Sequence, residues 1–181
     1  MLTHESRQLP SWLIFDVRQN MRSEVHTAFV KRFAFPPLKV PPPVSTDDIH
    51  AVEEELQTTF PAAFVSFLVA HGPIFTPDIL GVIVDAQEAG ARTEAFDVRE
   101  FFSPAEMTKT YRMYVGGGMD ESLIPFAMDS GGSVFGFRRS KSLVRPDDCP
   151  VLFFDHDYCR VRAEADSFDQ WLSRFVDLKV P

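Results

Sequence analysis

Apolar residues recur at helical spacing in four segments of the chain, and each segment begins after a residue that favours a helix start. Ser45, Ser103 and Ser167 are typical N-cap residues, and each is followed three residues later by Asp, Glu or Gln, as in a capping box. Pro61 suits the first turn of the second helix, and glycines follow the second and third segments. The apolar stripes of the four predicted helices are Ile49, Val52, Leu56 and Phe60; Phe64, Phe67 and Leu68; Met107, Tyr111 and Tyr114; and Phe168, Trp171, Leu172, Phe175 and Val176.

Short β-favouring stretches lie between these helices. The turn sequences Asp129–Gly132 and Asp155–Asp157 each join two such stretches and predict two hairpins. In the last stretch apolar and charged residues alternate, which is typical of a strand with one solvated face. The pattern predicts an α+β fold, in which helices pack on one face of a mainly antiparallel sheet: two at the start of the core domain and one at its C-terminus. The predicted strands are Ile79–Val84, Ile124–Met128, Ser133–Phe137, Val151–Phe154 and Tyr158–Glu164.

Residues 1–43 differ from the rest and are predicted to form an N-terminal extension. Within them, Trp12–Val17 and Val25–Phe35 favour β-structure and predict a strand pair. The segment Pro36–Pro43 holds five prolines, which fix φ and lack an amide donor, so we expect an extended connector. Residues 44–181 then form the main domain.

The charge of the chain narrows the class of partner. The chain carries 26 Asp and Glu against 18 Lys and Arg, which gives a formal net charge of −8. Residues 1–43 contribute +3 and residues 44–181 contribute −11. An acidic domain repels the phosphate backbone, so direct nucleic-acid binding is not expected, whereas a basic protein would be attracted.

Compartment and redox state follow from the start of the chain and its cysteines. The first apolar run, Trp12–Phe15, is too short for a signal peptide or a membrane span, and no stretch elsewhere approaches the required length. Cys149 and Cys159 are too far apart for a zinc or redox motif, and we expect buried free thiols. These features predict a cytoplasmic protein without a membrane partner.

Candidate catalytic and metal sites are weak. The serine motif of chymotrypsin-like proteases is similar to Asp129–Gly132, and their histidine motif is similar to Val69–Gly72. The Gly, Pro and Cys that flank these motifs in the proteases are replaced here. The donors of Asp155–Asp157 suit a metal, yet three consecutive residues on a tight turn rarely converge on one ion. We therefore predict no catalytic residue, metal or cofactor, and a metal at this turn stays an alternative.

Four groups of residues, in this order, resemble the SUKH superfamily of Smi/Knr-like proteins. The resemblance spans residues 45–175, is loose over 73–123 and does not include 1–43. Phe60 and His71 stand where this superfamily usually has Leu and Asn. The groups are Ile49, Glu53, Leu56, Phe60-Pro61, Phe64, Phe67-Leu68 and His71-Gly72; Ile124–Ala127, Asp129 and Gly131–Ser133; Pro150-Val151 and Asp155–Asp157; and Asp166–Phe168 with Trp171-Leu172.

The resemblance implies an α+β interaction module without a catalytic centre. Bacterial members are immunity proteins that bind and neutralise cognate toxins, often nucleases, and fungal relatives act in cell-wall signalling through protein contacts. We therefore expect a non-enzymatic module that covers a basic toxin domain with an acidic surface. The alternatives are a scaffold or regulatory subunit of the same fold, and a small-molecule-binding protein or hydrolase. The candidate interface residues are Asp129, Asp155, Asp157 and Glu164 at or beside the turns, with Glu53 and Glu54 as a second patch.

Overall fold

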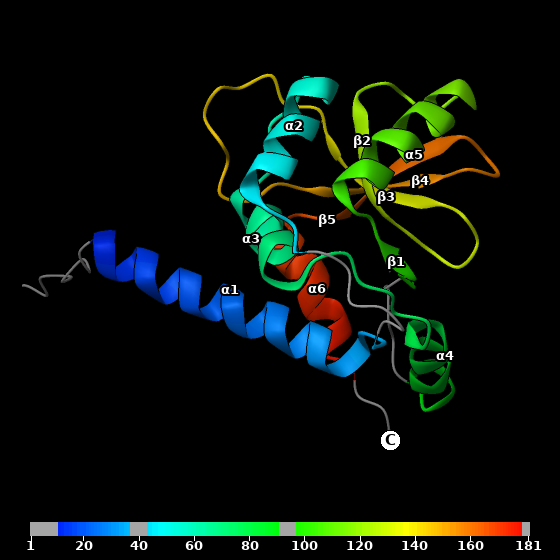
Figure 1. The fold of residues 1–181 in the computed structure, drawn as a ribbon. Helices are drawn as coiled ribbons and strands as arrows, with labels where there is room; N and C mark the ends of the chain where they lie inside the picture. Colours follow the sequence, from blue (N-terminus) through cyan, green and yellow to red (C-terminus); the bar gives the residue numbers. More distant parts are fainter. Residues whose placement is uncertain (1–10, 37–42, 91–96, 179–181) are drawn as a thin grey trace, which may run out of the picture.

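The computed structural model describes residues 11–36, 43–90 and 97–178, with side chains from residue 20 onward, and confirms the α+β fold (Figure 1). The helices in this part of the chain are α1 (Ser11–Phe33), α2 (Thr46–Leu56), α3 (Ala62–His71), α4 (Ile79–Glu88), α5 (Pro104–Gly116) and α6 (Phe168–Val176). The strands are β1 (Glu100–Phe101), β2 (Leu123–Met128), β3 (Val134–Arg138), β4 (Val151–Asp155) and β5 (Arg160–Ala165).

The five strands form an antiparallel sheet in which each strand pairs with its neighbours in the sequence, in the order β1-β2-β3-β4-β5. In such a meander, the β2–β3 turn and the β4–β5 turn lie at the same end of the sheet. The long β3–β4 connection, residues 139–150, lies at the opposite end (Figure 1). The two hairpins predicted from the turn sequences are confirmed.

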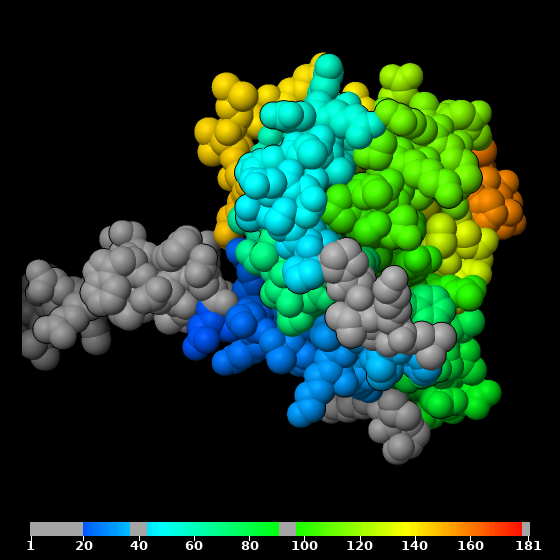
Figure 2. Space-filling view, viewed as in Figure 1, coloured from blue at the N-terminus to red at the C-terminus, as the bar shows by residue number. Residues whose placement is uncertain are grey.

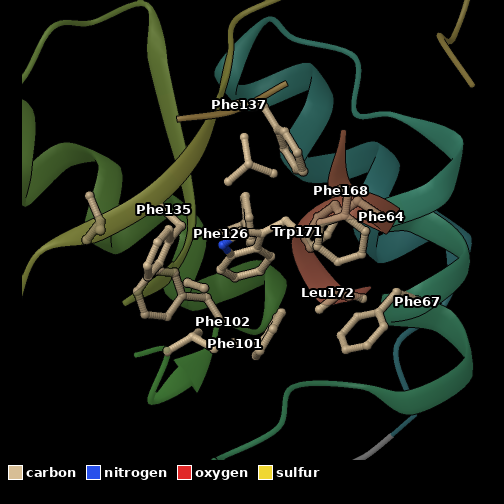
Figure 3. Close-up of a cluster of buried hydrophobic side chains, with 14 of the residues drawn as sticks. Phe64, Phe67, Phe101, Phe102, Phe126, Phe135, Phe137, Phe168, Trp171 and Leu172 are labelled. Carbon is tan, nitrogen blue, oxygen red and sulfur yellow. The ribbon is translucent and has the colours of Figure 1, made fainter. Parts of the chain in front are cut away.

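One face of the sheet packs on α3 and α6 through aromatic side chains. Trp171 lies with its ring centre 4.8 Å from that of Phe135 and 5.4 Å from that of Phe126 (Figure 3). Phe126 in turn stacks on Phe137 at 4.4 Å across the β2–β3 pair. This close approach needs a glycine between the two β3 aromatics, because a Cβ at Gly136 would lie 2.6 Å from the Ile124 carbonyl oxygen.

The other face is covered in part by α5. Phe153 and Phe154 are consecutive in β4 and therefore point to opposite faces. Phe153 contacts Phe135 on the α6 side, whereas Phe154 contacts Tyr114 of α5. The sheet thus has helices on both faces and not on one face as expected: α5, which the Ser103 cap and its apolar stripe predict as a helix, lies on the face opposite to α3 and α6.

The predicted helix caps are present. The Ser45 hydroxyl accepts the Asp48 amide at 3.1 Å, and the Asp48 carboxylate accepts the Ser45 amide at 2.9 Å. Ser103 forms the same reciprocal capping box at the start of α5. Ser167 caps α6 by accepting the Gln170 amide at 3.0 Å. These local signals fix where three of the helices begin.

Three predicted β-segments lie in helices. The strand pair proposed within 12–35 is wrong, because α1 places His26, Phe29 and Phe33 on one buried face at helical spacing. The strand proposed at 79–84 is also wrong, since Ile79 and Ile83 in α4 are buried one helical turn apart. Short apolar runs do not distinguish a buried strand from a buried helix, and packing decides between them. The centre of the proline connector, residues 37–42, lies outside the described residues.

Helix α1 packs across α6 and is held there by charged contacts. The Arg22 guanidinium donates to Asp169 at 2.9 Å and to both carboxylate oxygens of Asp147 at 3.0 and 3.1 Å. His26 lies 2.9 Å from the other Asp169 oxygen. Arg32 donates to the Val176 and Leu178 carbonyls at 2.6 Å, at the end of α6 where free carbonyls favour a cation. Although α1 has 23 residues, no helix in the described ranges is long and apolar enough to cross a bilayer.

We predict that Phe29→Ala lowers the free energy of unfolding by about 3–5 kcal/mol, as expected for a buried phenylalanine. The Phe29 side chain is fully buried against Phe67, Phe101 and Phe175. Met21 lies on the same helix and is 61% exposed, so Met21→Ala is the matched control and should change stability by less than about 0.5 kcal/mol. Urea denaturation measures both, and equal effects would contradict the packing of α1 on the core.

Candidate partner-binding site

Four carboxylates gather where the two hairpin turns meet, and we call this region the hairpin end. It consists of turn residues 129–133 and 156–159 together with Asp97 and Asp155. Figure 2 shows the two turns as neighbouring yellow and orange surfaces at one edge of the molecule. Of the predicted interface residues, Asp129, Asp155 and Asp157 lie here, because each adjoins a turn of the same meander.

The first turn wraps its backbone amides around Asp129. The Asp129 carboxylate accepts the Ser133 amide at 2.7 Å, and the amides of Gly131 and Gly132 lie close enough to lower its pKa slightly. Partial burial raises the pKa of Asp129, and the negative charge of Asp97 raises it further, although the turn amides oppose this. Asp97 itself accepts the Ser130 amide at 2.9 Å.

The second turn is organised around Asp155. One Asp155 carboxylate oxygen accepts the amides of Asp157 at 3.1 Å and of Tyr158 at 3.3 Å. This local arrangement is typical of Asp at the start of a turn. Because the Asp155 carboxylate is engaged by its own turn, the Asp157 side chain, 75% exposed, is the more accessible of the two.

Ser133 and His156 join the two turns. The Ser133 hydroxyl lies 3.1 Å from Nδ1 of His156, and Nε2 of the same ring lies 3.3 Å from the Asp157 carboxylate. Tyr114 of α5 adds a third contact by donating to the Gly132 carbonyl. Through these contacts the side chains of three separate elements fix the two turns relative to each other.

The Ser133–His156–Asp157 arrangement has the residue types of a serine hydrolase triad, but its surroundings do not suit acyl transfer. An oxyanion needs backbone amides that are free to donate to it. Here the Ser133 amide already donates to the Asp129 carboxylate, whose charge would repel an oxyanion at this turn. Ser133 is also buried. The geometry supports a structural link between the turns.

Glu53, expected at an exposed second patch, is buried. Its carboxylate receives two hydrogen bonds from the Arg145 guanidinium at 2.7 and 2.9 Å and one from the Phe60 amide at 2.7 Å. Arg145 belongs to the β3–β4 connection, so this ion pair holds the long loop against α2. Glu54, on the same helix, is exposed as expected.

Glu164, expected beside a turn, is also buried and lies away from the hairpin end. It occupies the last part of β5, where Arg174 of α6 donates to its backbone carbonyl at 2.5 Å. A register shift in the β4–β5 pairing makes Glu164 the extra residue of a bulge. Glu53 and Glu164 are therefore buried within the fold, and the other four predicted residues face solvent at least in part.

Sequence reasoning missed Asp97. It lies at the hairpin end because β1 pairs with the end of β2, which sets Glu100 opposite Met128. A strand of two residues gives no periodic signal, so only the pairing reveals this neighbour.

Comparison with known proteins identifies one family. The model of the SMI1 / KNR4 family (SUKH-1) matches residues 43–174, which is more than half of the chain. The matched range includes both hairpins and all four carboxylates of the hairpin end, and it begins after α1. No curated protein matches the chain.

We predict that Arg145→Met lowers the free energy of unfolding by about 3 kcal/mol, because it leaves the Glu53 carboxylate buried without its cation. Arg112 pairs with Glu55 on the exposed side of the same helix and provides the matched control. Arg112→Met should cost less than about 1 kcal/mol. Chemical denaturation of both variants distinguishes the two sites; equal losses would contradict the structural role of Glu53.

The two thiols should differ in reactivity. Burial, with a contribution from the Asp148 charge, raises the pKa of the Cys149 thiol to about 12, so little thiolate forms at pH 8. Cys159 was expected to be buried but is exposed, at the second turn. We predict that a disulfide reagent at pH 8 modifies Cys159 rapidly and Cys149 only after unfolding. Cys159→Ser should abolish the fast reaction, and a fast phase that survives this substitution would contradict the burial of Cys149.

Proposed function

Because the chain belongs to the SMI1/KNR4 family (SUKH-1), we propose that it is a protein-binding immunity protein that binds a cognate toxin and neutralises it without catalysis. The family is generally of the toxin-immunity type. In this proposal the partner is a basic toxin domain, such as a nuclease, and binding takes place in the cytoplasm. The contact is made through the hairpin end, with no metal or cofactor.

The observation that carries the proposal is the gathering of Asp97, Asp129, Asp155 and Asp157 at one end of a rigid sheet. The backbone amides of the two turns and the Ser133–His156 contact hold this end in place. A preorganised surface loses little conformational entropy when a partner binds. The geometry therefore supports recognition by a fixed negative surface.

Electrostatics also supports a basic partner. Residues 44–181 carry a formal charge of −11, and charge of this size accelerates encounter with a positively charged protein. Nuclease domains grip phosphate with basic surfaces, so an acidic surface placed over such a site would block the substrate. The Ser133 amide is already engaged by the Asp129 carboxylate, which favours binding over catalysis at this end.

The experiment uses the product of the neighbouring open reading frame as the probe. Cells that produce the neighbouring gene product alone should grow poorly. Co-expression of the full chain should restore their growth. For the purified pair, we predict that Asp157→Lys lowers affinity about tenfold, mainly through slower association, because it replaces an exposed negative charge with a positive one. Surface plasmon resonance at low and high salt measures both rates, and the difference between variants should shrink as salt rises.

Glu54→Lys is the matched control, since it makes the same charge change at an exposed position of α2, away from the turns. We expect it to leave affinity close to that of the unchanged protein. Loss of binding in Glu54→Lys with normal binding in Asp157→Lys would move the interface to α2 and overturn the assignment to the hairpin end.

A further inference from the structure

We propose that the outer edge of β5 binds an extended, acidic segment of a partner protein as a sixth strand of the sheet. This surface borders the hairpin end and shares Asp155 and Tyr158 with it, but it is centred on the strand edge and on Arg160 and Arg162. The proposal rests on three observations about residues 155–164: an unpaired strand edge, a groove beside it, and two arginines that point to the same face.

The first observation is the edge itself. Among the residues that the structure describes, β5 is the last strand of the sheet and pairs only with β4. Its first four residues, 160–163, are all exposed. An edge strand directs alternate N–H and C=O groups away from its partner, and these groups can pair with an added strand. The free edge ends at Glu164, because the Arg174 guanidinium already donates a hydrogen bond to the Glu164 backbone carbonyl.

The second observation is a groove along this edge. It has a volume of about 340 Å³ and is lined by Asp155, Tyr158, Arg160, Val161 and Arg162. Tyr158 is 70% exposed and Val161 is 38% exposed, which provides apolar contact area next to the free backbone groups. A groove of this composition suits a peptide that offers its backbone to the strand and an apolar side chain to Tyr158 and Val161.

The third observation is the charge along the edge. Arg160 and Arg162 lie two residues apart, so they share one face of the sheet, the face that packs on α6. Arg162 is held over the Phe153 ring at 4.5 Å and lies 3.7 Å from the Glu164 carboxylate. No ion pair engages the Arg160 side chain within the part of the chain that the structure describes. Acidic side chains at alternate positions of an added strand would lie opposite these arginines.

The same arginines disfavour a second copy of this chain as the occupant. If β5 pairs with β5 of another copy about Val161, Arg160 of one copy faces Arg162 of the other. Like charges directly opposite each other destabilise a strand pair. A basic segment is disfavoured for the same reason. Asp155 also lines the groove and would repel an acidic side chain of the bound segment. The acidic residues of that segment are therefore expected only opposite Arg160 and Arg162.

The test uses the full chain and a short synthetic peptide that alternates glutamate and valine. NMR titration should shift the amide signals of residues 160–163. A peptide with lysine in place of glutamate should bind about tenfold more weakly, because it reverses every cross-strand charge pair. A glutamate peptide with proline in place of valine keeps the charge, but it loses the amide donors at the valine positions and has φ fixed at about −65°, far from the value of an antiparallel β-strand. We expect it to bind at least about tenfold more weakly.

Arg160→Glu should weaken binding of the glutamate peptide about fivefold without loss of stability, whereas Glu54→Lys, distant in the fold, should have no effect. Equal binding of the lysine or proline peptide, or no shift at residues 160–163, overturns the proposal. Shifts of these amides when the protein alone is concentrated would assign the edge to self-pairing and overturn it as well. None of these results depends on whether the hairpin end binds a toxin.

Discussion

The packing of Trp171 against Phe126 and Phe135 is the contact on which the rest of the structure depends. It fixes α6 on the sheet, and α6 in turn carries the acceptors that hold α1 and the arginine that closes the edge of β5. Interlocked aromatic rings leave few alternative arrangements, because their geometry is specific and the interior is densely packed. A rigid sheet then presents its turns and its free edge in fixed positions.

The acidic residues of this chain have two separate roles. Glu53, Asp169 and Glu164 lie at least partly buried and contact arginines, where their charges position a loop, a helix and the end of a strand. At the hairpin end, the carboxylates of Asp97, Asp129 and Asp155 contact backbone amides, whereas the exposed Asp157 carboxylate lies beside the His156 ring. Formal net charge therefore overstates the charge that is available to a partner. What a partner meets depends on which carboxylates the fold leaves without a cation.

The β4–β5 hairpin connects two surfaces of opposite charge. Its turn carries Asp155 and Asp157, and its outer strand carries Arg160 and Arg162. The two surfaces are only a few residues apart, but the pleat and the turn direct them differently. A protein of this size can thus offer a negative surface to one segment of a partner and a strand edge to another, without any moving part.

The sequence by itself determined the features that depend on local chemistry: the caps at Ser45, Ser103 and Ser167, the two hairpins, and the placement of Asp129, Asp155 and Asp157 beside turns that a meander brings together. Only the tertiary structure decided that 12–33 and 79–84 are helical, because short apolar runs fit either a strand or a helix until they pack. It also decided the burial of Glu53 and Glu164 and the approach of Asp97. Each of these depends on residues distant in sequence, such as Arg145 or β2, and local patterns carry no information about such pairings.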